Sequence, residues 1–85
     1  MHVGYSRKFL KNASRLPKKL IALAEEKEFL FRNEPHHPSL RTHQLHGKER
    51  GTSAFWINYH YRIKFLFLSD NRVLFLDIGP HDFYE

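Results

Sequence analysis

Apolar and polar residues in the first half of the chain recur with the period of an α-helix. Between Phe9 and Ala13 the apolar positions have helical spacing, and Ser6 before them is a residue type favoured at helix N-caps. Leu16-Pro17 interrupts this helix, because proline suits the first turn of a new helix and disfavours a helical conformation in the preceding residue. The pattern therefore predicts a short first helix, preceded by an opening HVGY that is short enough for an edge strand.

A second helix is predicted from Pro17 to about Asn33. It ends there because Pro35 and Pro38 keep the following stretch, EPHHPSL, as a loop. The apolar face of this helix consists of Leu20, Leu23, Ala24, Leu30 and Phe31. The two helices then form a helical hairpin with a single apolar stripe, which another layer of structure must cover.

The second half has the composition of β-strands, at residues 54–58, 61–68 and 73–78. Asp70-Asn71 is expected to form a two-residue hairpin loop between the last two, and a turn at Tyr59-His60 is expected to join the first two. The pairing around the two-residue loop places Ile63 opposite Ile78, Phe65 opposite Leu76 and Phe67 opposite Leu74. All six are apolar and share one side of the sheet, so this side is predicted to cover the helices, with Trp56 also in the core.

The opposite side of this sheet is predicted to be cationic at one end. Arg62 lies opposite Gly79, Lys64 opposite Asp77, and His60 level with His81, whereas at the turn end Leu66 lies opposite Phe75 and Leu68 opposite Val73. The expected fold class is α+β: a short N-terminal strand, a helical hairpin, and a three-stranded antiparallel meander that completes a four-stranded sheet. A chain of 85 residues allows one small domain, here residues 1–85.

The charge of the chain narrows its partners. With 14 Lys and Arg against 9 Asp and Glu, the net charge is +5 and the sequence pI about 9.8. This charge fits a protein that binds a polyanion such as nucleic acid, and it fits a solvated basic surface equally well. No run of about 18 apolar residues exists, and the first residues lack the apolar stretch of a signal peptide, so we expect no membrane association. The absence of cysteine fits a cytosolic protein.

The order of these elements, with a cationic sheet face, resembles the RelE/ParE superfamily of bacterial toxins, in particular the mRNA-interferase branch that includes RelE, YoeB and YafQ. Four segments carry the resemblance: YSRKFLKNASRLPKKL near the start, HPSLRTHQLHG at 37–47, YRIKF at 61–65 and LDIGPHDFY at 76–84. The last is the most specific, because in this family a strand ends in a Gly-x-His turn near the C-terminus. The resemblance implies a ribosome-dependent endoribonuclease that cuts mRNA in the ribosomal A site and is neutralised by a cognate antitoxin.

Site residues follow from the resemblance position by position. His81 matches the Gly-x-His histidine, Arg62 the arginine of the third strand, and His43 the histidine of the DHPLQG-type segment in the YafQ group. The chain departs from the family at Pro80, where Thr or Ser is usual, and in the spacing of the aromatic residues after His81. His60 falls where other members often carry an acidic or neutral residue, and we add it to the catalytic candidates.

Metal-free RNA cleavage uses the neighbouring 2′-hydroxyl as nucleophile, so it needs a base, an acid and cations around the phosphate. Histidine suits the first two roles because its pKa lies near neutrality, and guanidinium suits the third because it can bind two phosphate oxygens. The predicted RNA-binding residues are His46, Lys48, Arg50, Lys64 and Tyr84. The structural alternatives are that His81 only caps a strand, that Arg62 only forms an ion pair with Asp77 or a C-terminal acid, and that Lys64 only pairs with Asp77.

A metal site and any cofactor are not expected. His36, His37, His43 and His46 offer ligand atoms, but no His-Glu-x-x-His pattern accompanies them. Two other functions stay open from the sequence: a ParE-like inhibitor of DNA gyrase with the same fold, and a basic interaction module without activity. The predicted partners are a cognate antitoxin, the ribosome and mRNA.

Overall fold

Two local signals start the two helices. The computed structural model describes residues 1–81; in it, α1 spans Arg7–Ala13 and Ser6 caps it by accepting a hydrogen bond from the Phe9 N–H at 3.0 Å. Pro17 directly precedes α2, which spans Lys18–Asn33. Both predicted helices are therefore confirmed, with their boundaries. Neither helix in this part of the chain has the length and apolarity needed to cross a membrane.

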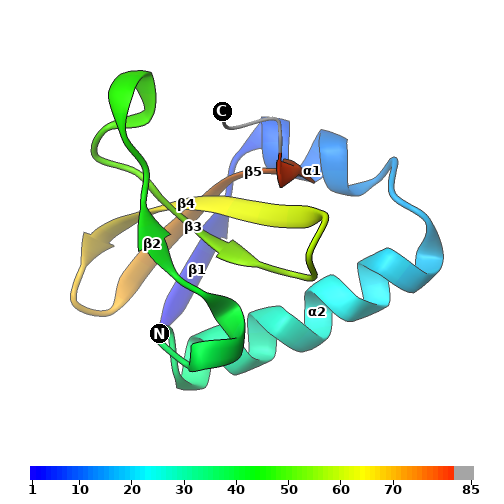
Figure 1. Cartoon of the computed structure of the whole chain (residues 1–85), viewed down its shortest axis with the longest axis horizontal. Coiled ribbons are helices and arrows are strands. Elements are labelled where there is room, and N and C mark those ends of the chain that lie inside the picture. Colours follow the sequence, from blue (N-terminus) through cyan, green and yellow to red (C-terminus); the bar gives the residue numbers. More distant parts are fainter. Residues whose placement is uncertain (82–85) are drawn as a thin grey trace.

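The helices lie beside a five-stranded sheet (Figure 1). Its strands are β1 (His2–Tyr5), β2 (His43–Gln44), β3 (Ser53–Trp56), β4 (Tyr61–Ser69) and β5 (Arg72–Pro80), in the order β1-β5-β4-β3-β2. β1 runs parallel to β5 and the other pairs are antiparallel. The predicted α+β class is confirmed, but the prediction of four strands is wrong by one. The extra strand, β2, has only two residues, and its pairing of His43 with Ala54 depends on a partner distant in sequence.

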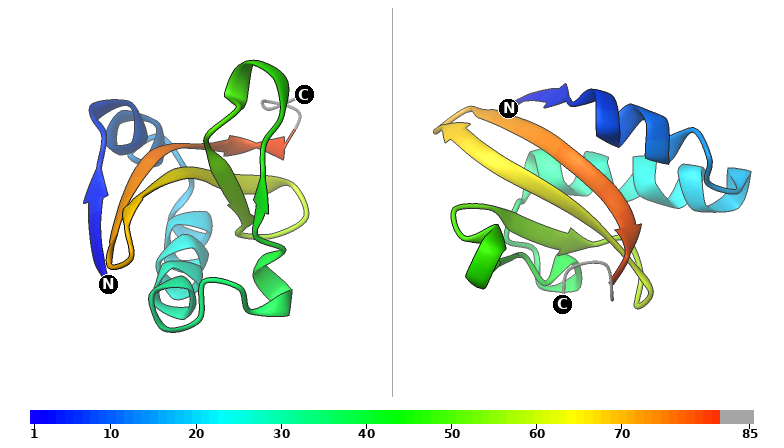
Figure 2. Two further views of the ribbon diagram at one scale, coloured as in Figure 1. Left: turned by 90° about the vertical axis from the view of Figure 1, so that its left-hand side faces the viewer. Right: turned by 90° about the horizontal axis from the view of Figure 1, so that it is seen from above.

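The helix α2 crosses one face of the sheet, as the two rotated views show (Figure 2). Its residue Phe31 lies at the centre of the core between the helix and the sheet. Its ring stacks on Phe55 with centroids 4.5 Å apart and meets the edges of Phe65 at 4.8 Å and Phe75 at 5.8 Å. α1 adds Phe9, which packs on Phe75 at 5.5 Å. One aromatic cluster therefore joins both helices to β3, β4 and β5.

The β4–β5 hairpin departs from the predicted register in its middle. The two-residue loop is confirmed by the pair Ser69–Arg72, and the far end pairs as predicted, Ile63 with Ile78 and Lys64 with Asp77. Between them the register shifts by one residue at two irregularities, near Leu68 on β4 and Leu76 on β5, so Phe65 pairs with Phe75 rather than with Leu76. Phe67 and Leu66 are likewise displaced, onto Val73 and Leu74 instead of Leu74 and Phe75.

Because of this shift, the β5 side chains that face the core near the turn are those that were expected on the opposite face of the sheet. Val73 and Phe75 are buried in the core, whereas Leu74 and Leu76, which were expected there, are partly exposed. The prediction for Phe67 is also wrong, because its side chain is 44% exposed close to the turn. The exchange places a phenylalanine rather than a leucine against Phe31, which buries a larger apolar side chain.

The β3–β4 turn is one residue longer than predicted. The Ile57 N–H donates to the Tyr61 carbonyl at 2.9 Å and Trp56 pairs with Arg62, so the turn comprises residues 58–60. Asn58 stabilises the turn, since its Oδ1 accepts hydrogen bonds from the backbone N–H groups of residues 60 and 61 at 2.9 and 2.8 Å. Because side chains alternate along β3, burial of Phe55 turns Trp56 to the other face, so its assignment to the core is wrong.

A polar network ties β1 to α2. The Tyr5 hydroxyl donates a hydrogen bond to Glu28, and Arg32 contacts both, at 3.3 Å from the Tyr5 hydroxyl and 3.1 Å from the Glu28 carboxylate. Burial, and then the hydrogen bond to Glu28, raise the pKa of Tyr5 above its usual value. The network therefore keeps the tyrosine protonated and holds the N-terminal strand against the helix.

Asp77 joins α1 to β5 through a carboxylate with no exposed surface. Its Oδ1 accepts hydrogen bonds from Asn12 Nδ2 at 2.6 Å and from the Ile78 N–H at 2.8 Å, and its Oδ2 lies 3.4 Å from Lys8 Nζ. Removing the carboxylate would leave the Asn12 and Ile78 donors without this acceptor.

We expect Asp77→Ala to lower the free energy of unfolding by about 2–4 kcal/mol, because each stranded buried donor costs on the order of 1–3 kcal/mol. For a domain of this size that corresponds to a fall of roughly 10–25 °C in Tm. Thermal unfolding followed by circular dichroism measures it, with Glu26→Ala, which removes an exposed helical carboxylate, as the matched control. A Tm for Asp77→Ala within 2 °C of the control would contradict the role of this buried carboxylate.

Candidate functional site

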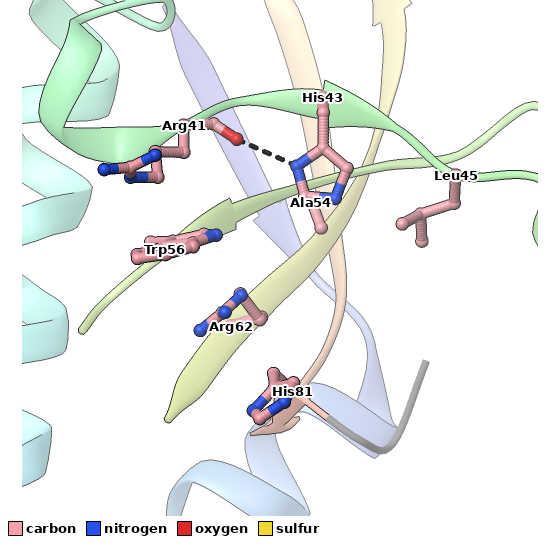
Figure 3. Close-up of a pocket in the computed structure, with 7 residues that line it drawn as sticks. All are labelled: Arg41, His43, Leu45, Ala54, Trp56, Arg62 and His81. Atoms are coloured by element: carbon pink, nitrogen blue, oxygen red, sulfur yellow. Dashed lines mark hydrogen bonds between the residues drawn. The ribbon is translucent and has the colours of Figure 1, made fainter. Parts of the chain in front are cut away.

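A cavity of about 410 Å³ opens on the face of the sheet opposite α2 (Figure 3). Strand alternation explains its position: Phe55, Ile63 and Phe65 point into the core, so their neighbours in β3 and β4 point to the other face. The cavity is lined by Arg41, His43, Leu45, Ala54, Trp56, Arg62 and His81. Residues from four separate segments between positions 41 and 81 therefore meet around one hollow.

The indole of Trp56 lies between two guanidinium groups. The Cζ atom of Arg62 is 4.0 Å from the ring centroid and that of Arg41 is 4.6 Å from it, and Figure 3 shows the two arginines on opposite sides of the ring. Both distances are within the range of cation–π contacts. We call this arrangement the Arg41–Trp56–Arg62 stack. It holds two positive charges beside the cavity although like charges repel.

Arg62 is fixed in place by the turn that precedes β4. Its side chain is 7% exposed, and its Nη1 donates hydrogen bonds to the carbonyl oxygens of Asn58 at 2.8 Å and Tyr59 at 2.6 Å. A longer contact of 3.3 Å joins Nη1 to the carbonyl of Tyr61. These hydrogen bonds to the turn set the position of the guanidinium beside the cavity.

Arg41 is held differently. It follows the 3₁₀ helix η1 (Pro38–Leu40) in the left-handed backbone conformation, with φ of 49°, which is uncommon for a residue with a side chain. Backbone strain of this kind costs about 1–3 kcal/mol and concentrates at functional sites. The residue is exposed, in contrast to Arg62. The strained backbone places its guanidinium over Trp56.

The imidazole of His43 has a defined tautomer. Its Nδ1 lies 2.8 Å from the Arg41 carbonyl oxygen, which can only accept a hydrogen bond, so Nδ1 carries the proton (Figure 3). In the neutral ring Nε2 then holds the free lone pair. His43 lies on β2, whose pairing of His43 with Ala54 brings the ring to the cavity wall. This arrangement suits a group that accepts a proton from a ligand.

His81 reaches the cavity from the end of β5. Its backbone N–H donates to the His60 carbonyl at 2.7 Å, and its ring lies 5.8 Å from the ring of Tyr59. The side chain is partly exposed and lines the same cavity as His43. Two titratable rings, one from β2 and one from the end of β5, together with two guanidinium groups, can bind a phosphodiester and move protons to and from it.

The other predicted residues lie outside this cavity. His60 is exposed in the β3–β4 turn, where its ring meets Tyr59 at 5.2 Å. His46, Lys48 and Arg50 lie on or beside η2 (Gly47–Glu49), in a loop that projects from the body of the protein (Figure 1). The loop turns at Gly47 and Gly51, with φ of 68° and 94°, values that glycine adopts readily. His46 and Arg50 line a separate hollow beside Phe67.

Lys64 forms an ion pair with Glu49. Its Nζ lies 3.1 and 3.0 Å from the two carboxylate oxygens, and the lysine is largely buried. Although Lys64 pairs with Asp77 in the ladder as predicted, the acid that the structure brings to its ammonium group is on η2. Lys64 therefore anchors the projecting loop to the sheet.

The cavity contains three residues that the sequence predicted for the site and two further charged or aromatic residues that it did not predict. Arg62, His43 and His81 come together as predicted, but Arg41 and Trp56 were not among the candidates. A signal for Trp56 exists in the alternation from buried Phe55, whereas nothing local marks Arg41. Tyr84 lies outside the described residues. Within residues 1–81, no group of three or more His, Asp or Glu side chains is arranged to hold a metal ion.

Comparison with known proteins shows a shared fold. No protein-family model and no curated protein sequence matches the chain. Among solved structures, YafQ from Escherichia coli BL21(DE3) superposes with a TM-score of 0.78 at 18% identity, over 94% of this chain and 92% of that one. The YoeB/ParE toxin from Agrobacterium tumefaciens gives 0.77 at 13% identity, over 95% and 99%.

A third similar structure is the toxin–antitoxin complex RelBE2 from Mycobacterium tuberculosis, with a TM-score of 0.76 at 19% identity over 94% of this chain and 96% of that one. The chain therefore has the RelE/YoeB/YafQ toxin fold, as the sequence predicted. At these identities the likeness establishes the fold alone.

Proposed function

We propose that this protein is the toxin of a type II toxin–antitoxin system and acts in the cytoplasm as a ribosome-dependent endoribonuclease that cleaves mRNA in the A site. The observation that carries the proposal is the convergence of His43, His81, Arg41 and Arg62 on one cavity of a toxin fold. Proton-transfer groups and phosphate-binding cations are the two requirements of RNA cleavage, and both meet there.

The reaction can be written with these groups alone. His43 Nε2 takes the proton of the 2′-hydroxyl, and the 2′-oxygen attacks the adjacent phosphorus. As the bond from phosphorus to the 5′-oxygen breaks, His81 gives a proton to that oxygen, so the products are a 2′,3′-cyclic phosphate and a 5′-hydroxyl. Arg62, whose guanidinium is fixed beside the cavity, stabilises the negative charge that develops on the phosphoryl oxygens.

Ribosome dependence fits the open form of the site. The cavity opens on the surface of the sheet, and His43 and Arg41 in its lining are exposed, so the protein alone holds little of a flexible RNA in place. A substrate already oriented by the ribosome would enter with much of its conformational freedom removed. Exposed Lys48 and Arg50, with His46, extend the positive surface along the projecting loop for contacts to RNA phosphates.

Two further residues, Lys64 and Tyr84, are proposed to contact the RNA. Lys64 would have to exchange its ion pair with Glu49 for a phosphate, which an incoming polyanion can drive. Tyr84, which belongs to the C-terminal segment, is proposed to stack on a base.

A cognate antitoxin is proposed as the protein partner, since the similar RelBE2 structure is a toxin–antitoxin complex.

The test is induced expression in a bacterial host, with mRNA 5′ ends mapped beside a His81→Ala control. We expect growth arrest and new 5′ ends within translated messages for the unaltered chain, and neither for His81→Ala. Binding of the variant to the antitoxin should be retained, which shows that it folds. Cleavage by His81→Ala at the original rate would remove that residue from the chemistry.

Two outcomes would replace the proposal. Growth arrest with intact mRNA and a DNA-damage response would instead indicate inhibition of DNA gyrase, the alternative left open by the sequence. Neither arrest nor cleavage would leave a binding module of the toxin fold. Because the three readouts differ, one experiment separates the enzyme from both alternatives.

A further inference from the structure

The chain contains a single tryptophan, and it lines the candidate active site. In the Arg41–Trp56–Arg62 stack the two faces of its ring are covered by groups held very differently. Arg62 is buried and fixed by carbonyl oxygens of the turn, whereas Arg41 is exposed and is placed by a strained backbone. One face of the indole is therefore permanently covered, and the other is covered by a group that can move away.

We propose that Trp56 is a stacking platform for a base of single-stranded RNA, and that Arg41 occupies the outer face of its ring until a base displaces it. The proposal deepens the function proposed above and rests on it for the class of ligand. Once displaced, the Arg41 guanidinium is free to bind the phosphate next to the stacked base. Arg62 stays beneath the ring in both states.

The relative strengths of the two contacts with the indole favour the replacement of Arg41 by a base. An exposed guanidinium–indole contact corresponds to roughly a 2- to 5-fold preference, whereas stacking of one base on an aromatic side chain corresponds to roughly 5- to 150-fold in affinity. Releasing Arg41 onto a phosphate adds a charge-assisted hydrogen bond that the free protein lacks. Each step of the exchange therefore replaces a weaker contact with a stronger one.

The surroundings of the ring favour RNA as the occupant. Trp56 shares its cavity with His43 and His81, the groups suited to proton transfer at a phosphodiester. A base stacked on Trp56 would place its own backbone beside those rings. The ring also contacts Tyr59, at 5.8 Å between centroids and nearly perpendicular.

The fluorescence of Trp56 reports this exchange directly, because no other tryptophan contributes. A single-stranded oligoribonucleotide titrated into the purified protein should quench the emission, since a base replaces the guanidinium on the ring. Inorganic polyphosphate of similar total charge is the matched ligand control; it should bind at low salt without the quenching. Equal quenching by both ligands, or by neither, would overturn the proposal.

A matched pair of variants tests the contribution to affinity. Trp56→Leu should weaken binding of a fluorescently labelled oligoribonucleotide at least 5-fold, and Phe29→Ala, which removes an aromatic ring that is 72% exposed on α2, should change it less than 2-fold. Trp56→Phe should lie between Trp56→Leu and the unaltered chain, because a smaller ring still stacks. Circular dichroism shows whether each variant is folded, and the titration of the unaltered chain decides the proposal if Trp56→Leu is not.

The outcomes separate this proposal from the function it rests on. Quenching by RNA, with weaker binding by Trp56→Leu but no mRNA cleavage in cells, would support the platform and reject the endoribonuclease. Cleavage in cells that Trp56→Leu leaves unchanged, without quenching by RNA, would retain the enzyme and reject the platform.

Discussion

Replacing Phe31 by alanine should lower the free energy of unfolding by about 3–5 kcal/mol, the usual cost of removing a buried aromatic ring from a packed core. The residue has no exposed surface and contacts the rings of Phe55, Phe65 and Phe75. A domain of this length has roughly 4–13 kcal/mol in total, so the variant would lose a large part of its stability and could be unfolded at 37 °C. Urea denaturation followed by circular dichroism measures the change.

The same helix offers a close control. Phe29 lies two residues before Phe31 in α2 but is 72% exposed, so Phe29→Ala should change the free energy of unfolding by less than about 0.5 kcal/mol. Both variants remove the same atoms from the same helix and differ only in burial. A loss of under 1 kcal/mol for Phe31→Ala would contradict the position of the core beneath α2.

His43→Asn should reduce mRNA cleavage by on the order of 10²- to 10⁴-fold, the usual contribution of a general acid or base. The asparagine side chain can still donate a hydrogen bond from Nδ2 to the Arg41 carbonyl, as His43 Nδ1 does at 2.8 Å. The variant therefore keeps the contact that orients the residue and lacks the Nε2 lone pair. Cleavage of one defined message in a translating extract measures the rate.

A histidine at the other edge of the sheet provides the comparison. His2 is exposed on β1, whereas His43 lies on β2 at the opposite edge, so His2→Ala should leave the cleavage rate within about 3-fold of the unaltered chain. If His43→Asn cleaves as fast as His2→Ala, His43 is not the base, and its hydrogen bond to Arg41 has a structural role.

Features set by neighbouring residues could be predicted from the sequence. Ser6 and Pro17 start the helices because capping and proline geometry act within a few residues, and Asp70-Asn71 forms its turn for the same reason. Pairing at the far end of the hairpin was also correct, because the charged and apolar residues there alternate clearly. Local chemistry therefore accounts for the helices and for the ends of the hairpin.

The middle of the hairpin could not be predicted, since its residues do not alternate. The stretches FLFL at 65–68 and VLFL at 73–76 are apolar on both faces, so a shift of one residue exchanges equivalent side chains and the pattern does not fix the register. The choice is made by Phe31, which packs against Phe75. A residue about forty positions earlier therefore decides which face of β5 is buried.

The residues of the candidate site also divide into those that could be predicted from the sequence and those that could not. Arg62, His43 and His81 were identified through a family resemblance that depends on short motifs. Arg41 and Trp56 are 15 positions apart in the sequence. They meet because β2 pairs with β3, and a two-residue strand gives too short a pattern to recognise. The stack is a consequence of tertiary structure that no single segment encodes.

The two irregularities in the β4–β5 hairpin also limit which insertions and deletions the two strands can accept. Each adds one unpaired residue on a different strand, so the second restores the alignment that the first displaces. Deleting one alone would shift the segments beyond it onto the wrong faces. Deleting both would give an uninterrupted ladder that keeps Phe65 opposite Phe75 and Arg62 opposite Gly79. Gains and losses of residues in these two strands are therefore coupled, and related chains are expected to change length there in pairs.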